Sequence, residues 1–201
     1  MPFAALDGLS PKKSTFGLQV EAQRLLLPTL TKTDEQFAEQ GIVFMEGHEG
    51  VNLEELNDLF EQVGFPRRDP DKLKLALEKT HTVIWIRHAK KSRWAKLNQL
   101  LGFGRAMSDG SISASIWDVA VLPAWQRSGL GRALLERLLV RLRQDHIDTI
   151  SLYAEPSVVK LYEKLGFVTD PQGIRGMAFQ RKSAIGMKVA AGEKRASVAK
   201  G

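Results

Sequence analysis

The sequence contains no cysteine, which excludes thiol catalysis, structural disulfides and zinc sites with cysteine ligands. Its four histidines are widely spaced and form no His-Glu-x-x-His pair, so we expect no metal site. No apolar run approaches the roughly 20 residues that a membrane span needs, because charged residues interrupt even the stretch 133–142. The first forty residues lack the long apolar stretch of a secretory signal. These absences predict a soluble protein without a metal.

The net charge of +6 is concentrated at one end of the chain. Residues 181–201 hold six cations and one anion, which leaves a net charge of only +1 for residues 1–180. This end is rich in Gly, Ala, Ser and Lys, and so few large apolar side chains cannot offset the entropy cost of ordering. We therefore expect residues 182–201 to be a basic disordered tail, and the nearly neutral remainder argues against a nucleic-acid partner.

The remaining length and the 43% hydrophobic content suit a single domain. Residues 1–40 mix Pro, Lys and Thr with short apolar patches, which predicts a partly disordered N-terminal extension. Between residues 41 and 181, strand-like and helix-like segments alternate, which predicts one α/β domain. The expected strands are 42–45, 82–88, 100–107, 112–122, 149–154, one beginning at 167–168 and a last one at 177–179, and the expected helices are 52–64, 69–79, one following residue 131, and 156–165.

Local signals support several of these elements. Asn52 with Glu55 three residues on is typical of a helix N-cap and capping box. Along residues 112–122 the two-residue period places Ile116, Asp118 and Ala120 on one strand face, where Asp118 is the only charged residue. A carboxylate on such a face is either a buried acceptor for backbone donors or a group with a raised pKa that transfers protons.

A glycine-containing loop precedes the long leucine-rich helix. The sequence from Gln126 to Gly131, QRSGLG, lies between a strand and a helix, an arrangement that binds phosphate through backbone N–H groups and the helix N-terminus. Arg127 and Arg132 can add full charges there. A dinucleotide fingerprint needs glycine at position 134, which is Leu134, and a Walker A loop needs Gly-Lys-Ser/Thr, which is absent.

Two motifs in fixed order carry a resemblance to a known family. VAVLP at Val119–Pro123 followed by QRSGLG, then LYEKLGF at Leu161–Phe167, resemble the GNAT superfamily of acetyl-CoA-dependent N-acetyltransferases. The resemblance covers residues 41–181. Three further segments, 50–69, 116–123 and 166–179, resemble the plant plastid branch, whose members acetylate protein lysines and N-termini or serotonin.

The resemblance implies a fold and a cofactor site. The fold is a central mixed, mostly antiparallel twisted sheet flanked by helices in a single domain. The co-substrate is acetyl-CoA, and no metal is implied. Residues implied in coenzyme binding are Val119, Ala120, Val121, Gln126, Arg127, Ser128, Gly129, Leu130, Gly131, Arg132 and Tyr162. The resemblance also implies a plastid location; otherwise we expect the cytoplasm, as a monomer or a homodimer.

Acetyl transfer to an amine needs a base, an oxyanion-stabilising group and an acid for the leaving thiolate. Tyr162 matches the family tyrosine that serves as general acid. A strand bulge around Ala120 and Val121 would direct backbone N–H groups at the thioester carbonyl. Asp118 is the candidate base and Glu155 its rival, with simple helix capping as the alternative role for Glu155.

The sequence does not identify the amine that accepts the acetyl group. Protein lysine or N-terminal amines are the first choice, and serotonin or another arylalkylamine is the alternative, with Trp117 and Trp125 as candidate walls of an aromatic pocket. Core packing is the other fate of these two side chains. A third reading is a non-catalytic module that senses acyl-CoA, which the retained Tyr162 beside an intact QRSGLG argues against.

Overall fold

The computed structural model describes residues 29–90 and 96–177 of the 201-residue chain. They fall into two units, divided after Val168. In the second unit, a 3-10 helix spans Pro171–Gly173. Arg175 Nε forms an ion pair with Asp170 Oδ2 at 3.8 Å. Within the described ranges, no helix is long and apolar enough to cross a membrane. The tail predicted for 182–201 and most of the N-terminal extension lie outside the described residues.

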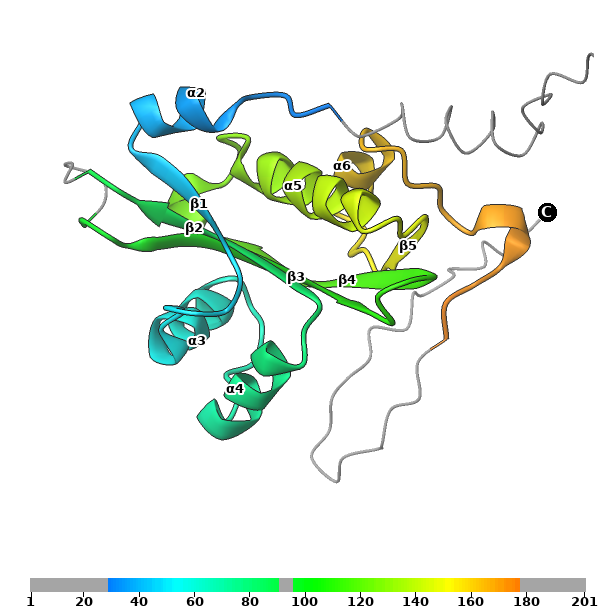
Figure 1. The fold of residues 1–201 in the computed structure, drawn as a ribbon, viewed down its shortest axis with the longest axis horizontal. Helices are drawn as coiled ribbons and strands as arrows, with labels where there is room; N and C mark the ends of the chain where they lie inside the picture. Colours follow the sequence, from blue (N-terminus) through cyan, green and yellow to red (C-terminus); the bar gives the residue numbers. More distant parts are fainter. Residues whose placement is uncertain (1–28, 91–95, 178–201) are drawn as a thin grey trace, which may run out of the picture. The chain divides into compact units, whose positions relative to one another are not determined.

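A five-stranded sheet forms the centre of the first unit (Figure 1). Neighbouring strands are antiparallel except for β4 and β5, which pair in parallel. The predicted mixed, mostly antiparallel sheet is therefore confirmed. The strands lie side by side in chain order: β1 (Ile42–Glu46), β2 (Thr82–His88), β3 (Leu100–Ser108), β4 (Ser113–Val121) and β5 (Thr149–Leu152).

Helices cover both faces of this sheet (Figure 1). α3 (Leu53–Gln62) and α4 (Pro70–Glu78) lie on one face, and α5 (Leu130–Gln144) lies on the other. α6 (Val159–Glu163) follows β5 and is shorter than the predicted helix 156–165. Because helices cover both faces of the sheet, every residue of β2, which has a strand on each side, is buried.

The α5 face of the sheet is packed closely. Leu134, Leu138 and Leu142 recur every four residues on α5 and are fully buried, each contributing about 2 kcal/mol through burial. Gly104 of β3 permits this approach, since a Cβ there would lie 3.1 Å from side-chain carbons of both Leu134 and Leu138. On the opposite face, Phe103 of β3 meets Phe60 of α3 edge to face, with ring centroids 5.8 Å apart.

The predicted cap of α3 is confirmed, but the capping box is wrong. The Asn52 side chain accepts hydrogen bonds from the N–H groups of Glu54 and Glu55, both at 3.0 Å. The Glu55 carboxylate turns away from the cap. It accepts from the Leu100 N–H at 2.7 Å and from the Arg87 guanidinium, so it ties α3 to the sheet instead.

The two-residue period predicted for 112–122 is wrong beyond Trp117. Arg105 is opposite Trp117 and Phe103 is opposite Ala120, so Asp118 and Val119 together oppose a single β3 residue. This is a β-bulge, and Asp118 adopts φ 54° within it. The extra residue places Ala120 on the α3 face, opposite to Ile116. The bulge also lies two residues before the predicted position at Ala120 and Val121.

The N-terminal boundary lies earlier than the predicted extension implied. α2 (Asp34–Glu39) packs on β1, where Phe37 is buried edge to face against Phe44 at 5.1 Å. Before α2, the N–H of Thr31 donates to Glu136 of α5 at 2.9 Å, and Arg137 pairs with Asp34. Residues 31–37 therefore pack on the domain rather than extending from it.

The end of the domain differs from expectation. Phe167 and Val168 form no strand, so that prediction is wrong. Met177 is irregular, and residues 178–179 of the predicted last strand lie outside the described part of the chain. Apolar residues in so short a run fit a strand or a packed loop equally well, which explains the error.

Candidate active site

A cavity of about 830 Å³ opens where β4 and β5 part. The two strands pair only from Ser113 opposite Thr149 to Ile116 opposite Leu152, whereas β4 continues to Val121. The second half of β4 therefore presents its edge to the cavity, and the segment after β5 forms the facing wall. Backbone groups along this edge are available to a ligand, as at any strand edge that lacks a partner.

The glycine loop forms one end of this cavity. Gln126, Arg127 and Gly131 line it, and α5 begins at Leu130 with Gly129 as its N-cap at φ 91°. Arg127 also has a positive φ of 59°. The Gln126 side chain donates to the Val121 carbonyl at 3.1 Å, which fixes the loop to the end of β4. A cavity lined by the first turn of a helix and an arginine suits a phosphate group.

Tyr162 and Glu155 lie on the wall after β5. Burial, followed by the negative charge of Glu155, raises the pKa of Tyr162 above its ordinary value of 10.0. The phenol is therefore protonated at neutral pH and can donate a proton. Its ring also packs edge to face on Phe167, with centroids 5.8 Å apart. Tyr162 is thus both a packed aromatic and a cavity-lining hydroxyl.

Asp118 lies on the opposite wall between two arginines. Its oxygens accept from Arg68 Nη2 and Arg105 Nε, each at 2.6 Å, and its side chain is 7% exposed. The bulge is the reason for this arrangement, because it directs Asp118 to the α3 face, where both guanidinium groups lie. Asp118 is thus an acceptor for charged side chains rather than for backbone donors.

The comparisons with known proteins agree with this geometry. The sequence model of the Acetyltransferase (GNAT) family matches residues 51–167, more than half of the chain. The chain belongs to the GNAT family. It is 43% identical over 155 residues to GCN5-related N-acetyltransferase 1, chloroplastic, of Arabidopsis thaliana, covering 77% of this chain and 76% of that protein.

Two further proteins are similar. Serotonin N-acetyltransferase 2, chloroplastic, of Oryza sativa subsp. japonica is 43% identical over 148 residues, 74% of this chain and 72% of that one. A GNAT-family acetyltransferase structure from Streptococcus pneumoniae superposes with a TM-score of 0.55 at 23% identity, covering 71% of this chain and 99% of that one, and shares the fold. This GNAT protein is accordingly an acetyl-CoA-dependent N-acetyltransferase that acts on an amine.

The structure brings most of the predicted site residues of this GNAT protein to the cavity. They are Trp117, Asp118, Val119, Ala120, Val121, Gln126, Arg127, Gly131, Glu155 and Tyr162. Ser128, Gly129, Leu130, Arg132 and Trp125 are not among the lining residues. Arg132 pairs instead with Glu136 at 2.7 Å, and Leu130 is buried in the core.

Trp125 does not line the cavity; it is partly buried and packs against the core, which was the alternative given for this side chain. Its ring packs against the buried imidazole of His88, with centroids 5.4 Å apart. The aromatic partner of Trp117 at the cavity is Tyr153, at 5.7 Å. No role was predicted for Tyr153, which lies within the predicted strand 149–154, whereas the observed β5 ends one residue before it, at Leu152.

Arg68 and Arg105 were also missed. They are separated from Asp118 by 50 and 13 positions in the chain, so no local motif contains the cluster. The unexplained carboxylate on an apolar strand was the one available signal, because a buried charge needs a partner.

Proposed function

We propose that this enzyme transfers acetyl groups to amines of proteins, either lysine side chains or N-terminal amines. The observation that carries the proposal is one cavity that holds the glycine loop at one end and Tyr162 with Glu155 on the wall. Two aromatic lining residues, Trp117 of β4 and Tyr153 after β5, are 40% and 58% exposed, and we propose that a chain segment of the acceptor enters beside them. The similarity to a GCN5-related N-acetyltransferase supports this choice of acceptor.

The coenzyme's phosphates are assigned to the glycine loop. Gly131 and the other N-terminal residues of α5 offer N–H groups without helical partners, and Arg127 adds a positive charge. A Cβ at Gly129 would meet no atom within 4 Å, so the backbone is open to a close ligand. The unpaired edge of β4, residues 117–121, is proposed to receive the extended arm of the coenzyme.

Tyr162 and Glu155 are proposed as the proton-transfer pair. Glu155 accepts a proton from the attacking amine, directly or through a water. The new bond forms between the amine nitrogen and the acetyl carbon, the carbon–sulfur bond breaks, and Tyr162 donates a proton to the leaving thiolate. We assign stabilisation of the oxyanion to backbone N–H groups at the bulge of Asp118 and Val119. Both Asp118 oxygens already accept from guanidinium groups, so we assign it a positioning role.

The test is coenzyme A release with a lysine peptide, a peptide with a free N-terminus and serotonin offered in parallel. We expect release with a peptide. Tyr162→Phe should lower kcat by about a hundredfold or more while the affinity for acetyl-CoA changes little. An equal loss of both would show that the hydroxyl serves binding or packing and would remove its role as the acid.

The aromatic pair Trp117 and Tyr153 favours a second candidate acceptor, an arylalkylamine such as serotonin, and a plant relative carries that activity in its name. Preference for serotonin over both peptides would select it. If acetyl-CoA binds and no amine supports release, a coenzyme-sensing module takes the place of both. The chloroplastic names of two plant relatives support a plastid location for this chain.

A further inference from the structure

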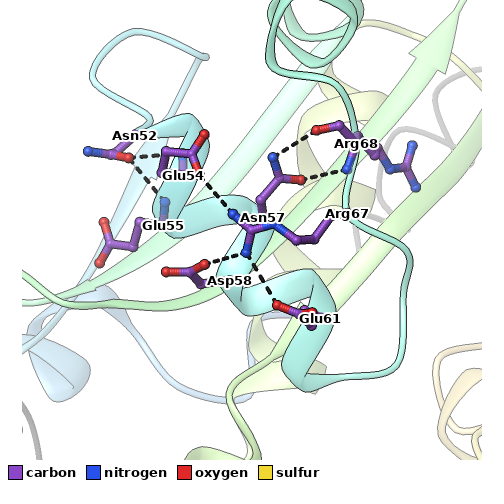
Figure 2. A network of polar contacts seen from close by, with 8 residues as sticks. All are labelled: Asn52, Glu54, Glu55, Asn57, Asp58, Glu61, Arg67 and Arg68. Carbon is purple, nitrogen blue, oxygen red and sulfur yellow. Dashed lines mark hydrogen bonds and ion pairs between the residues drawn. The ribbon is translucent and has the colours of Figure 1, made fainter.

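Two adjacent arginines after α3 have different surroundings (Figure 2). Arg67 turns back over α3 and pairs with Glu54, Asp58 and Glu61 at 2.7, 2.6 and 3.3 Å. Its charge is more than balanced on a surface outside the cavity. Arg68, the next residue, lines the cavity. Of this pair, Arg68 is the cation that a ligand in the cavity can reach.

Arg68 is held in position by a buried side chain. Asn57 of α3 is 1% exposed, and its amide donates to the Arg68 carbonyl and accepts from the Arg68 N–H, both at 2.9 Å (Figure 2). The guanidinium group lies 5.2 Å from the centre of the Phe60 ring. The side chain is thus oriented before any ligand binds, which lowers the entropy cost of binding.

The wall around Arg68 has positive charge to spare. Arg68 and Arg105 share the single carboxylate of Asp118, and Arg105 also donates to the Thr80 hydroxyl at 3.1 Å. Arg68 Nε is buried and has no hydrogen-bond partner among the described residues. The Arg68 side chain as a whole is 34% exposed and lines the cavity, so another part of it is open to a ligand oxygen. A carboxylate matches both the charge and the donor geometry of a guanidinium group.

The other wall carries the opposite charge. Glu155, the anionic member of the proposed proton-transfer pair, lies there beside Tyr162, and the net positive charge of the arginine cluster lies on the wall formed by β4. We propose that the preferred acceptor carries a carboxylate next to its reactive amine, and that Arg68 is the specificity-determining residue that binds this carboxylate. This inference rests on the proposed function. An acidic residue beside the reactive amine of a peptide provides this chemistry, and so does a free amino acid, whose α-carboxylate lies next to its amine.

The experiment compares two peptides that differ only in Glu or Gln at the residue next to the reactive amine. Coenzyme A release gives kcat/KM for the wild type, Arg68→Gln and the control Arg67→Gln. We expect the wild type and Arg67→Gln to prefer the Glu peptide by about tenfold or more, and Arg68→Gln to lose this preference. Free glutamine and glutamine amide, in which an amide replaces the α-carboxylate, are assayed in parallel and distinguish an amino-acid acceptor from a peptide.

Equal use of both peptides by the wild type would overturn the inference while leaving protein acetylation intact. If none of the amines offered supported coenzyme A release, the proposed function would be overturned and this inference with it. An equal loss of preference in Arg67→Gln would show that general surface charge is responsible and would also overturn it. If Arg68→Gln does not fold, Arg68→Lys takes its place, because lysine keeps the positive charge but lacks the planar guanidinium group. This variant should show a reduced preference for the Glu peptide. An unchanged preference would contradict binding of the carboxylate by the guanidinium group.

Discussion

Replacement of Asn57 by alanine tests how the fold positions Arg68. The change removes two hydrogen bonds of 2.9 Å from a fully buried amide to the Arg68 backbone. At about 1 kcal/mol for each bond, the free energy of unfolding should fall by about 2 kcal/mol. Urea denaturation of the wild type and the variant measures this difference from the two midpoints.

The variant should also change acceptor selection. A loosened Arg68 backbone increases the entropy cost of binding the carboxylate, so KM for the Glu peptide should rise several-fold while that for the Gln peptide stays constant. The matched control is Asn52→Ala on the same helix. Asn52 caps α3, so this change costs about 1 kcal/mol of stability without touching Arg68.

Two results would refute this reasoning. If Asn52→Ala raised KM for the Glu peptide as much as Asn57→Ala does, general loosening of α3 would explain the effect. If Asn57→Ala changed KM equally with and without Arg68→Gln, the amide would not act through Arg68, because coupled positions give non-additive effects.

Three other predictions concern the scaffold. Burial favours the neutral form of Glu136, but hydrogen bonds from Thr31 and Arg132 outweigh it and hold the pKa of Glu136 below 4.5. The stabilising contribution of the Glu136 carboxylate is therefore present above about pH 4.5 and is lost as pH falls through its pKa in the folded state. The difference in unfolding free energy between the wild type and Glu136→Gln, measured in urea, should become smaller on acidification. A difference that stays constant with pH would contradict this. Gly129→Ala places a Cβ at φ 91°, which should cost about 1 kcal/mol and weaken acetyl-CoA binding measured by calorimetry; unchanged affinity would argue against the loop as the phosphate site. Leu134→Ala should lower the unfolding free energy by about 3 kcal/mol in urea, and a loss under 1 kcal/mol would show that α5 repacks around the gap.

The regular elements could be predicted because their signals are local. The strand 82–88 was predicted with its observed bounds, since seven consecutive β-branched, aromatic and long side chains fit a strand buried on both faces. The Asn52 cap was predicted because it depends on bonds within one helical turn. The capping box failed because Glu55 found stronger partners in Arg87 and the Leu100 N–H, which only the packed sheet brings near.

The candidate site was predicted where a motif lies within one segment of the chain. The glycine loop, Tyr162 and Glu155 each lie in such a segment. In the structure, Arg127 and Gly131 of the loop line one cavity together with Tyr162 and Glu155. The arginine cluster was not predicted, because Arg68 reaches Asp118 across 50 positions of the chain. A side-chain partner at that separation depends on the sheet register, which the sequence pattern left open.

The bulge in β4 connects these two outcomes. With an unbroken two-residue period, Asp118 would share the α5 face with Ile116, where buried leucines of α5 offer no partner for a carboxylate. An unpaired charge in that position would cost several kcal/mol. The extra residue instead turns Asp118 toward Arg68 and Arg105 and brings Val121 beside Gly131 on the α5 face. One strand therefore carries both the arginine cluster and the contact to the glycine loop. The same residue that breaks the sequence pattern is therefore the one that gives the cavity two chemically different sides.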